Sequence, residues 1–211
     1  MTTNYLINDI DLKLINFSKP KKQADYLVCK VKYNGAGLFI QLPKMKIKNL
    51  NKNMELEFTN GNKYNKKSYD FLSNLDTFVA DYIFENAEEW FGKKIPMDSI
   101  KNMYNKFIKA PKSSSENCTM NFVLKKDCVF IDKKLEPLEI SDFKIDDTVE
   151  SISQLKYILF SKDTCFAVWE TISLKLYKKP IARVPAFGFI QDDSDLKSDS
   201  ESDDDFDFCF F

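Results

Sequence analysis

The order in which residue patterns change along the chain most constrains its fold. Between Ser68 and Phe91, apolar residues recur at helical spacing, at positions 71, 75, 78 and 82 and at 72, 79, 83 and 90. A second helix, capped by Asp98 or Ser99, is predicted to run through Ile108. Strand-like sequence precedes and follows these helices, so we predict a helical insertion at about residues 68–109 within a mainly β protein.

The strand-like stretches lie at 26–33, 38–42, 54–58, 119–124, 128–131, 155–160 and 165–177. The residues NGAG at 34–37 predict a hairpin turn between the first two. In the last stretch, alternation is expected to place positions 172, 174 and 176 on one face and 171, 173, 175 and 177 on the other. This order predicts an α+β protein, mainly β, with an OB-like five-stranded barrel; a β-sandwich is the alternative.

Several chemical groups that enzymes and cofactor sites commonly use are missing. The chain has no histidine, and none of its five glycines lies in a GxGxxG or GxxxxGK[ST] motif. The five cysteines are scattered and odd in number, which indicates reduced thiols rather than a disulfide framework or zinc site. We therefore expect a non-enzyme without cofactor or metal, although paired carboxylates leave an enzyme as an alternative. With neither a signal-peptide pattern nor a run of about 20 apolar residues, an intracellular protein is expected.

Charge divides the chain into two predicted regions, a domain at 1–191 and a disordered acidic tail at 192–211. The tail has nine acidic residues and one lysine, whereas the remainder has a net charge of +7. Residues 19–67 alone contain twelve lysines and three acidic residues. Such a basic block attracts polyanions, and nucleic acid is the polyanion we expect, although a solvated lysine-rich surface is the competing interpretation.

Lysines interleaved with aromatic residues favour single-stranded nucleic acid, because lysines contact phosphates while rings stack on bases. For each ring taken alone, packing within the protein is the competing interpretation. Only one arginine is present, Arg183, which favours sequence-independent binding over base-specific readout. The candidate DNA-binding residues are Lys30, Lys32, Tyr33, Lys44, Lys46, Lys48, Lys63, Tyr64, Lys66, Lys67, Tyr157, Trp169, Lys175 and Tyr177.

The acidic tail also contains four phenylalanines among its last six residues. Acidic residues alone would make the segment soluble, but exposed rings are unfavourable in a purely solubilising tail. We expect the acids to compete with DNA for the basic surface and the rings to anchor a partner protein. The candidate partner-binding residues are Asp203, Asp204, Asp205, Phe206, Asp207, Phe208, Phe210 and Phe211.

Three features together resemble the OB-fold single-stranded DNA-binding proteins of short-tailed T-odd bacteriophages and their counterparts in nucleo-cytoplasmic large DNA viruses. They are the tail DSESDDDFDFCFF, the helical insertion, and the closing hairpin LKYILFSKDTCFAVWETISLKLY. The resemblance implies a homodimer that coats single-stranded DNA during viral DNA replication, recombination and repair. It also implies tail contacts with the replicative DNA polymerase and helicase-primase, in a viral replication compartment of the host cytoplasm or nucleus.

Two further functions remain open from the sequence. An RNA-binding OB protein would use the same lysine and ring contacts, and the 2′-hydroxyl would distinguish its ligand. A virion or scaffold interaction protein would use the acidic-aromatic tail to bind a basic partner, and it would show no affinity for single strands at moderate salt.

Overall fold

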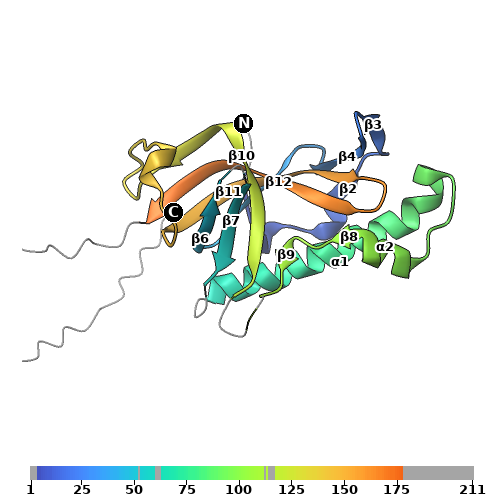
Figure 1. Ribbon diagram of the computed structural model, residues 1–211, viewed down its shortest axis with the longest axis horizontal. Helices are drawn as coiled ribbons and strands as arrows, with labels where there is room; N and C mark the ends of the chain where they lie inside the picture. The colour runs from blue at the N-terminus through green and yellow to red at the C-terminus, as the bar shows by residue number, and fades with distance from the viewer. Residues whose placement is uncertain (1–3, 52, 60–62, 112, 114–116, 178–211) are drawn as a thin grey trace, which may run out of the picture. The chain divides into compact units, whose positions relative to one another are not determined.

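Five strands close into a barrel in the computed structural model, which describes residues 4–51, 53–59, 63–111, 113 and 117–177 (Figure 1). Around the barrel, β6 is followed by β7, β10, β12 and β11, and β11 pairs with β6 again. The β10–β12 pair is parallel and the other four pairs are antiparallel. This order confirms the predicted α+β, OB-like fold. The strands are β6 (Met45–Leu50), β7 (Asn53–Phe58), β10 (Thr119–Ile131), β11 (Thr148–Phe160) and β12 (Cys165–Tyr177).

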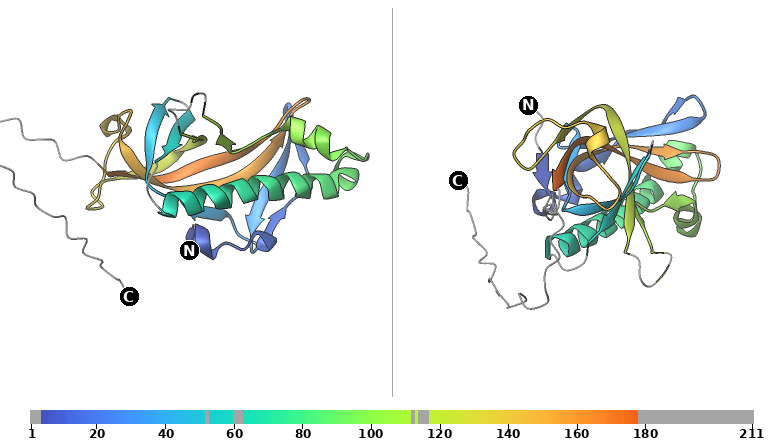
Figure 2. Two further views of the ribbon diagram at one scale, coloured as in Figure 1. Left: turned by 90° about the horizontal axis from the view of Figure 1, so that it is seen from below. Right: turned by 60° about the vertical axis from the view of Figure 1, so that its left-hand side comes forward.

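The helices lie between the second and third barrel strands, as predicted. Helix α1 (Lys63–Phe91) buries Leu72, Leu75 and Val79 and runs beside the long strands of the barrel (Figure 2). Helix α2 (Met97–Met103) ends before the predicted Ile108. The helix ends early because the chain becomes extended there and pairs with two barrel strands. Strand β8 (Tyr104–Asn105) pairs with β12, and strand β9 (Ile108–Lys109) pairs with β10.

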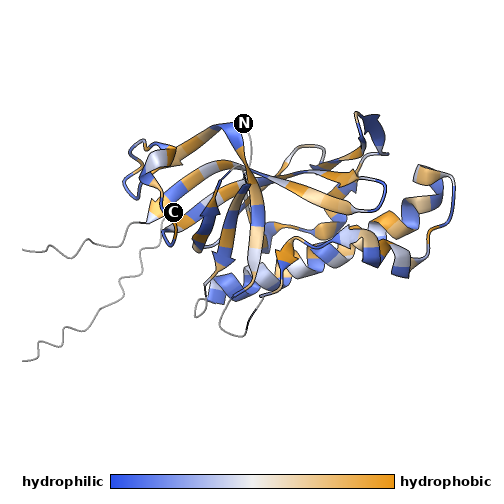
Figure 3. Ribbon diagram, in the orientation of Figure 1, coloured by the Kyte–Doolittle hydropathy of each residue, from blue (hydrophilic) through white to orange (hydrophobic). Residues whose placement is uncertain are grey.

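Strand β11 joins the barrel to a flanking sheet. Its first residues pair with β6, its middle with β5 (Leu38–Gln41) and its end with β4 (Tyr26–Tyr33). The flanking sheet also contains β1 (Asn4–Leu6), β2 (Ile15–Phe17) and β3 (Lys21–Gln23). Short 3-10 turns occur at Ile7–Asp9, Leu12–Leu14 and Ile140–Asp142. All three residues of β3 are exposed and hydrophilic (Figure 3).

The prediction of which β12 residues share a face was wrong, because the register of the β11–β12 ladder shifts. Across the β11–β12 ladder, Thr171 faces Ser153 and Ser173 faces Ile152, so Ile172 has no cross-strand partner. A bulge of this kind reverses the alternation on one side of it. Thr171 consequently points inward, where its hydroxyl lies 3.1 Å from that of Ser153, rather than sharing an outer face with Tyr177.

The hydrophobic core fills the barrel and continues under the flanking sheet. Barrel strands contribute Met45, Leu56 and Phe122, while Phe160 packs against the rings of Trp90 and Phe91 from α1. All four cysteines in the described part of the chain are free thiols, at positions 29, 118, 128 and 165. No helix within the described ranges is long and apolar enough to cross a membrane.

Candidate nucleic-acid interface

An open groove lies on the outer surface of β4 and β11. Its volume is about 520 Å³, and it is lined by Gln23, Lys30, Val31, Lys32, Gly35, Ala36, Gly37, Gln154, Lys156 and Tyr157. Alternation along β4 exposes Lys30 and Lys32 while Val31 is buried. In the ladder with β11, Lys30 faces Tyr157. The groove therefore combines three lysines with an aromatic ring, and none of its lining residues is acidic.

The β4–β5 turn shapes one end of this groove. Gly35 has a φ of +80°, a conformation that glycine adopts without steric cost. At Gly37, a Cβ atom would lie 2.7 Å from Nε2 of Gln154 and 2.7 Å from the ring of Phe39. Any larger residue at 37 would displace these side chains, so this glycine allows them to close on the backbone.

Lys156 and Tyr157 form the β11 side of the groove. The Lys156 Nζ lies 5.2 Å from the centre of the Tyr157 ring and 2.9 Å from both carboxylate oxygens of Glu170. Partial burial lowers the pKa of Lys156, but hydrogen bonds to Glu170 and Tyr157 outweigh that effect and leave the pKa raised. Lys156 is therefore held in its charged form beside the ring.

This arrangement can bind a nucleic-acid strand without reading its sequence. The ammonium groups of Lys30 and Lys32 are available to phosphates, and the Tyr157 ring can stack on any base. Lysine supplies a point charge without the bidentate geometry of arginine.

A second basic cluster surrounds Tyr177 at the end of β12. The Nζ atoms of Lys44, Lys175 and Lys133 lie 4.3, 5.4 and 5.6 Å from the ring centre. The Tyr177 hydroxyl donates a 2.6 Å hydrogen bond to Glu150. Burial, followed by this hydrogen bond and the charge of Glu150, raises the pKa of Tyr177. Lys46 lies in the same cross-strand row, because it faces Thr148, which in turn faces Tyr177.

The outer surface of β7 and β10 has a different chemistry. OB folds commonly bind oligonucleotides on the face of their second and third strands, which are β7 and β10 here. Glu57 is 6% exposed and lies 3.5 Å from Lys48, and Glu55 accepts a 2.8 Å hydrogen bond from Thr119. The predicted site residue Lys48 therefore pairs with a carboxylate.

Two predicted stacking residues, Tyr33 and Trp169, lie in the core. Tyr33 is 4% exposed, and Trp169 is 2% exposed and packs edge-on against Phe107 at 5.5 Å. Packing within the protein accounts for the burial of both rings, since each occupies an inward position of its strand, and Trp169 also lines a pocket of about 270 Å³ with Lys106 and Lys109. Stacking on a base stays a prediction for each ring.

The remaining predicted residues lie elsewhere or outside the described part. Lys63, Tyr64, Lys66 and Lys67 belong to the first turns of α1, and none lines the groove. The Tyr64 hydroxyl donates to the carbonyl of Gln41 at 3.3 Å, and burial is the main cause of its raised pKa. The tail residues Asp203–Asp205, Phe206, Asp207, Phe208, Phe210 and Phe211 fall outside the described residues.

Three residues of these two sites, Lys156, Gln154 and Lys133, were not among the residues predicted from the sequence. Lys156 precedes Tyr157 in a recognised strand-like stretch, so the lysine-tyrosine pair was a usable signal. Lys133 follows β10 and meets Tyr177 only through the tertiary fold, so no local signal could have identified it.

The barrel with its helical insertion defines the class as an OB-fold protein. The chain belongs to a protein family described as "Family of unknown function (DUF5871)", which matches residues 43–190. No curated protein sequence matches the chain significantly.

Solved structures of two phage single-stranded DNA-binding proteins are similar to this chain. The protein from bacteriophage Enc34, in complex with single-stranded DNA, is 12% identical with a TM-score of 0.46, covering 76% of this chain and 94% of that one. The protein encoded by bacteriophage T7 is 10% identical with a TM-score of 0.48, covering 74% and 100%.

Proposed function

We propose that the chain is a sequence-independent single-stranded DNA-binding protein and that the groove on β4 and β11 is its binding site. The observation that carries this proposal is the lining of the groove, which brings the exposed Lys30 and Lys32 together with Tyr157 and includes no carboxylate. Lys156 also lines it and is paired with Glu170. The Tyr177 cluster would supply a second contact, in which Lys44 and Lys175 bind phosphates.

The acidic tail is proposed to regulate this site. Its net charge of −8 makes it a competitor for the lysines when DNA is absent, and DNA binding would free it for other proteins. The replicative DNA polymerase and helicase-primase are the proposed partners, in viral DNA replication, recombination and repair. A homodimer within a viral replication compartment completes the proposal, and both features rest on the resemblance stated from the sequence.

The test is fluorescence anisotropy of labelled oligo-dT with the full chain over a series of salt concentrations. We expect affinity to fall steeply with salt, with a log–log slope of about −0.7 for each phosphate contact. A chain with Asp203, Asp204 and Asp205 replaced by asparagine should bind more tightly than the wild type.

Other outcomes of the same titration contradict the proposal. Tighter binding of oligo-U than of oligo-dT would indicate an RNA-binding OB protein. No binding to either strand at about 50 mM salt, where electrostatic attraction is strong, would favour a virion or scaffold interaction protein.

A further inference from the structure

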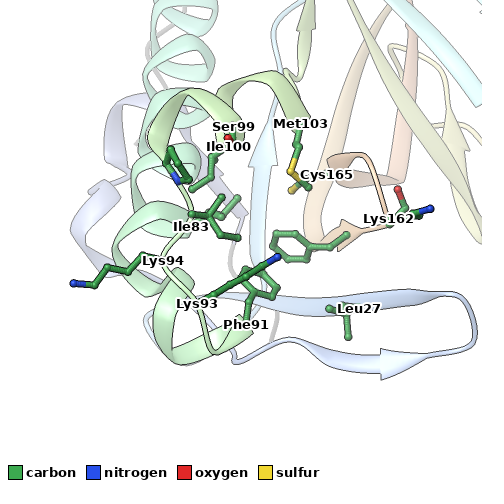
Figure 4. A pocket seen from close by; sticks show the side chains of 14 residues that line it. Leu27, Ile83, Phe91, Lys93, Lys94, Ser99, Ile100, Met103, Lys162 and Cys165 are labelled. Carbon is green, nitrogen blue, oxygen red and sulfur yellow. The ribbon is translucent and has the colours of Figure 1, made fainter.

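A cavity of about 450 Å³ lies between the two helices and the β11–β12 turn. This volume falls within the range of about 300–1,000 Å³ that is typical of ligand pockets. Figure 4 shows the residues that line it: Leu27, Ile83, Phe91, Lys93, Lys94, Ile95, Pro96, Ser99, Ile100, Met103, Phe160, Ser161, Lys162 and Cys165. The proposed DNA-binding groove shares none of these residues, so the cavity is a separate candidate site.

Most of the wall of this cavity is apolar. Aliphatic side chains and a thioether form a large part of it: Leu27, Ile83, Ile95, Ile100 and Met103. The rings of Phe91 and Phe160 add an aromatic part and meet edge-on at 5.4 Å. Burial raises the pKa of the Cys165 thiol, so this wall residue is neutral at physiological pH. An alkyl chain inside the cavity would therefore exchange water for carbon contacts, which stabilises it with every methylene buried.

The charged side chains that line the cavity are all cations. They are Lys93, Lys94 and Lys162, and no lining residue is acidic. In Figure 4, Lys94 and Lys162 lie at opposite sides of the cavity. Lys94 lies 3.7 Å from Glu88, but both side chains are largely exposed, so the pair is weak. Neither Lys93 nor Lys162 has an ion-pair partner among the described residues.

Two of these lysines have a second explanation in the fold. Gly92, with a φ of +70°, ends α1 and donates its amide hydrogen to the carbonyl of Glu88 at 2.9 Å. Lys93 and Lys94 follow directly, and cations beyond the C-terminal end of a helix interact favourably with its dipole. Lys162 belongs instead to the turn between β11 and β12, so the dipole of α1 does not account for it. Lys162 is therefore the residue that most specifically marks a place for an anion.

The cavity and the groove occupy opposite sides of one strand pair. Lys30 faces Tyr157 on the outer side, and Leu27 faces Phe160 three residues further along the same ladder. Since neighbouring positions alternate between faces, this odd separation places Phe160 on the helix side. A ligand held in the cavity would therefore lie on the other face of these strands and leave the groove open.

We propose that this cavity binds a free fatty acid. The alkyl chain lies along the apolar wall, and the carboxylate pairs with Lys162 and Lys93. An apolar interior with cations and no carboxylates at its edge favours an anion that has a single alkyl chain. A neutral alcohol of the same length gains only the burial of its chain, and an alkylammonium ion is repelled by the lysines. This binding is independent of the proposed DNA-binding function.

The test is a titration of the full chain, labelled with ¹³C at the methionine methyl groups, with dodecanoate below its micelle-forming concentration. The Met103 methyl resonance should shift and saturate, because Met103 lines the cavity. Met45 and Met120 are the matched controls, since they are fully buried in the barrel and should not shift. A Met103→Leu variant assigns the resonance.

Chain length and head group test the two halves of the proposed site. Affinity should rise about fourfold with each added methylene from octanoate through decanoate to dodecanoate. Dodecanol should bind more weakly than dodecanoate, and dodecyltrimethylammonium should leave Met103 unshifted. An affinity that does not depend on chain length would contradict burial of the chain in the cavity.

A pair of exposed lysines tests the carboxylate contact. Lys162→Glu should weaken the binding of dodecanoate several-fold and leave the binding of dodecanol unchanged. The matched control is Lys126→Glu, which reverses an exposed lysine of β10 and should change neither. Equal losses for dodecanoate and dodecanol in Lys162→Glu would show that the lysine does not contact the head group.

The absence of a saturable Met103 shift, or an equal shift of Met45 and Met120, would overturn the inference. Sedimentation of the chain with phosphatidylglycerol vesicles, without a Met103 response to dodecanoate, would also overturn it, because the lysines would then bind a membrane surface. No nucleic acid is present in these titrations, so either failure would leave the proposed DNA-binding function standing.

Discussion

The outer surfaces of two strand pairs in this protein differ in charge, since one carries lysines and glutamates together and the other carries lysines alone. On β7 and β10, the outward residues include Glu55 and Glu57, and Lys48 is paired with Glu57 at 3.5 Å. On β4 and β11, Lys30 and Lys32 are exposed beside Tyr157, and the groove has no acidic lining. Both surfaces are formed by strands of one sheet, in which residues point alternately inward and outward. The types of the outward residues therefore determine which surface can attract a polyanion.

This difference makes the β4–β11 groove the stronger candidate, although OB folds commonly use the second and third strands. Lys48 is paired with Glu57, just as Lys156 is paired with Glu170, whereas Lys30 and Lys32 have no ion-pair partner among the described residues. Opposite-charge attraction acts over about 10 Å at 0.1 M salt, so the sign of the nearest side chains decides the contact.

The largest expected effect comes from reversing charge in the groove. The double variant Lys30→Glu/Lys32→Glu should weaken oligo-dT binding by about 100-fold at low salt, since each lost phosphate contact is worth about 1.4 kcal/mol. Anisotropy titration measures it, with circular dichroism to confirm folding. If this variant bound oligo-dT with wild-type affinity, the groove would not be the DNA-binding site.

Removing the ring of Tyr157 should have the next largest effect on binding. Tyr157→Ala should reduce affinity roughly tenfold, because stacking on one base contributes about 1–3 kcal/mol. Tyr157→Phe keeps the stacking surface and is the matched control, so its affinity should stay close to that of the wild type. Equal losses in the two variants would show that the hydroxyl, rather than the ring, makes the contact.

A change beneath β8 and β9 should alter stability without altering binding. Asp76 accepts hydrogen bonds from the Tyr104 hydroxyl at 2.8 Å and from the Phe107 amide at 2.9 Å, and it is 4% exposed. Asp76→Ala should lower the free energy of unfolding by about 1–3 kcal/mol, because two buried donors lose their acceptor. Urea denaturation measures this, and oligo-dT affinity of the folded variant should be unchanged.

Asp76 also predicts a pH dependence. Burial raises its pKa above the ordinary 3.8, against the lowering effect of its hydrogen bonds. The folded chain therefore binds a proton more tightly than the unfolded chain at this site. Its contribution to stability is full below pH 3.8 and declines as the pH rises through the folded-state pKa. Asp76→Asn should abolish that component of the stability profile; an unchanged profile would contradict the assignment.

The smallest effect is expected on the opposite surface. Lys109→Glu/Lys126→Glu reverses two exposed lysines on β9 and β10 and matches the groove variant in charge. Affinity for oligo-dT should change by less than about threefold, which reflects long-range attraction alone. A loss as large as that of the groove variant would erase the distinction between the two surfaces.

Local pattern was sufficient to predict several elements. The bounds of β12 at 165–177 and β4 at 26–33 agree with the strand-like stretches, and the insertion of helices between barrel strands was expected. The strand β6 (Met45–Leu50) was missed, although its Met45 and Ile47 are both buried. Lys46 and Lys48 alternate with these buried residues, but within a lysine-rich block they indicated a basic surface rather than the outward positions of a strand.

Features that depend on long-range pairing could not be predicted. The bulge that turns Thr171 inward exists only in the ladder with β11, and the ends of α2 and β8 depend on pairing with β12. Lysines of the block at 19–67 lie on β3, β4, β6 and α1, and only Lys30 and Lys32 among them line the groove. The partner of Lys30, Tyr157, comes from a strand 127 positions later.

The groove can be tested most directly by a photocrosslink between the full chain and oligo-dT containing 5-iodouracil, with the attachment site identified by mass spectrometry. We expect attachment at Tyr157, because a base stacked on its ring is in direct contact with it. Attachment within 53–58 or 119–123 would instead place the strand on the β7–β10 surface and rule out the groove as the main binding site.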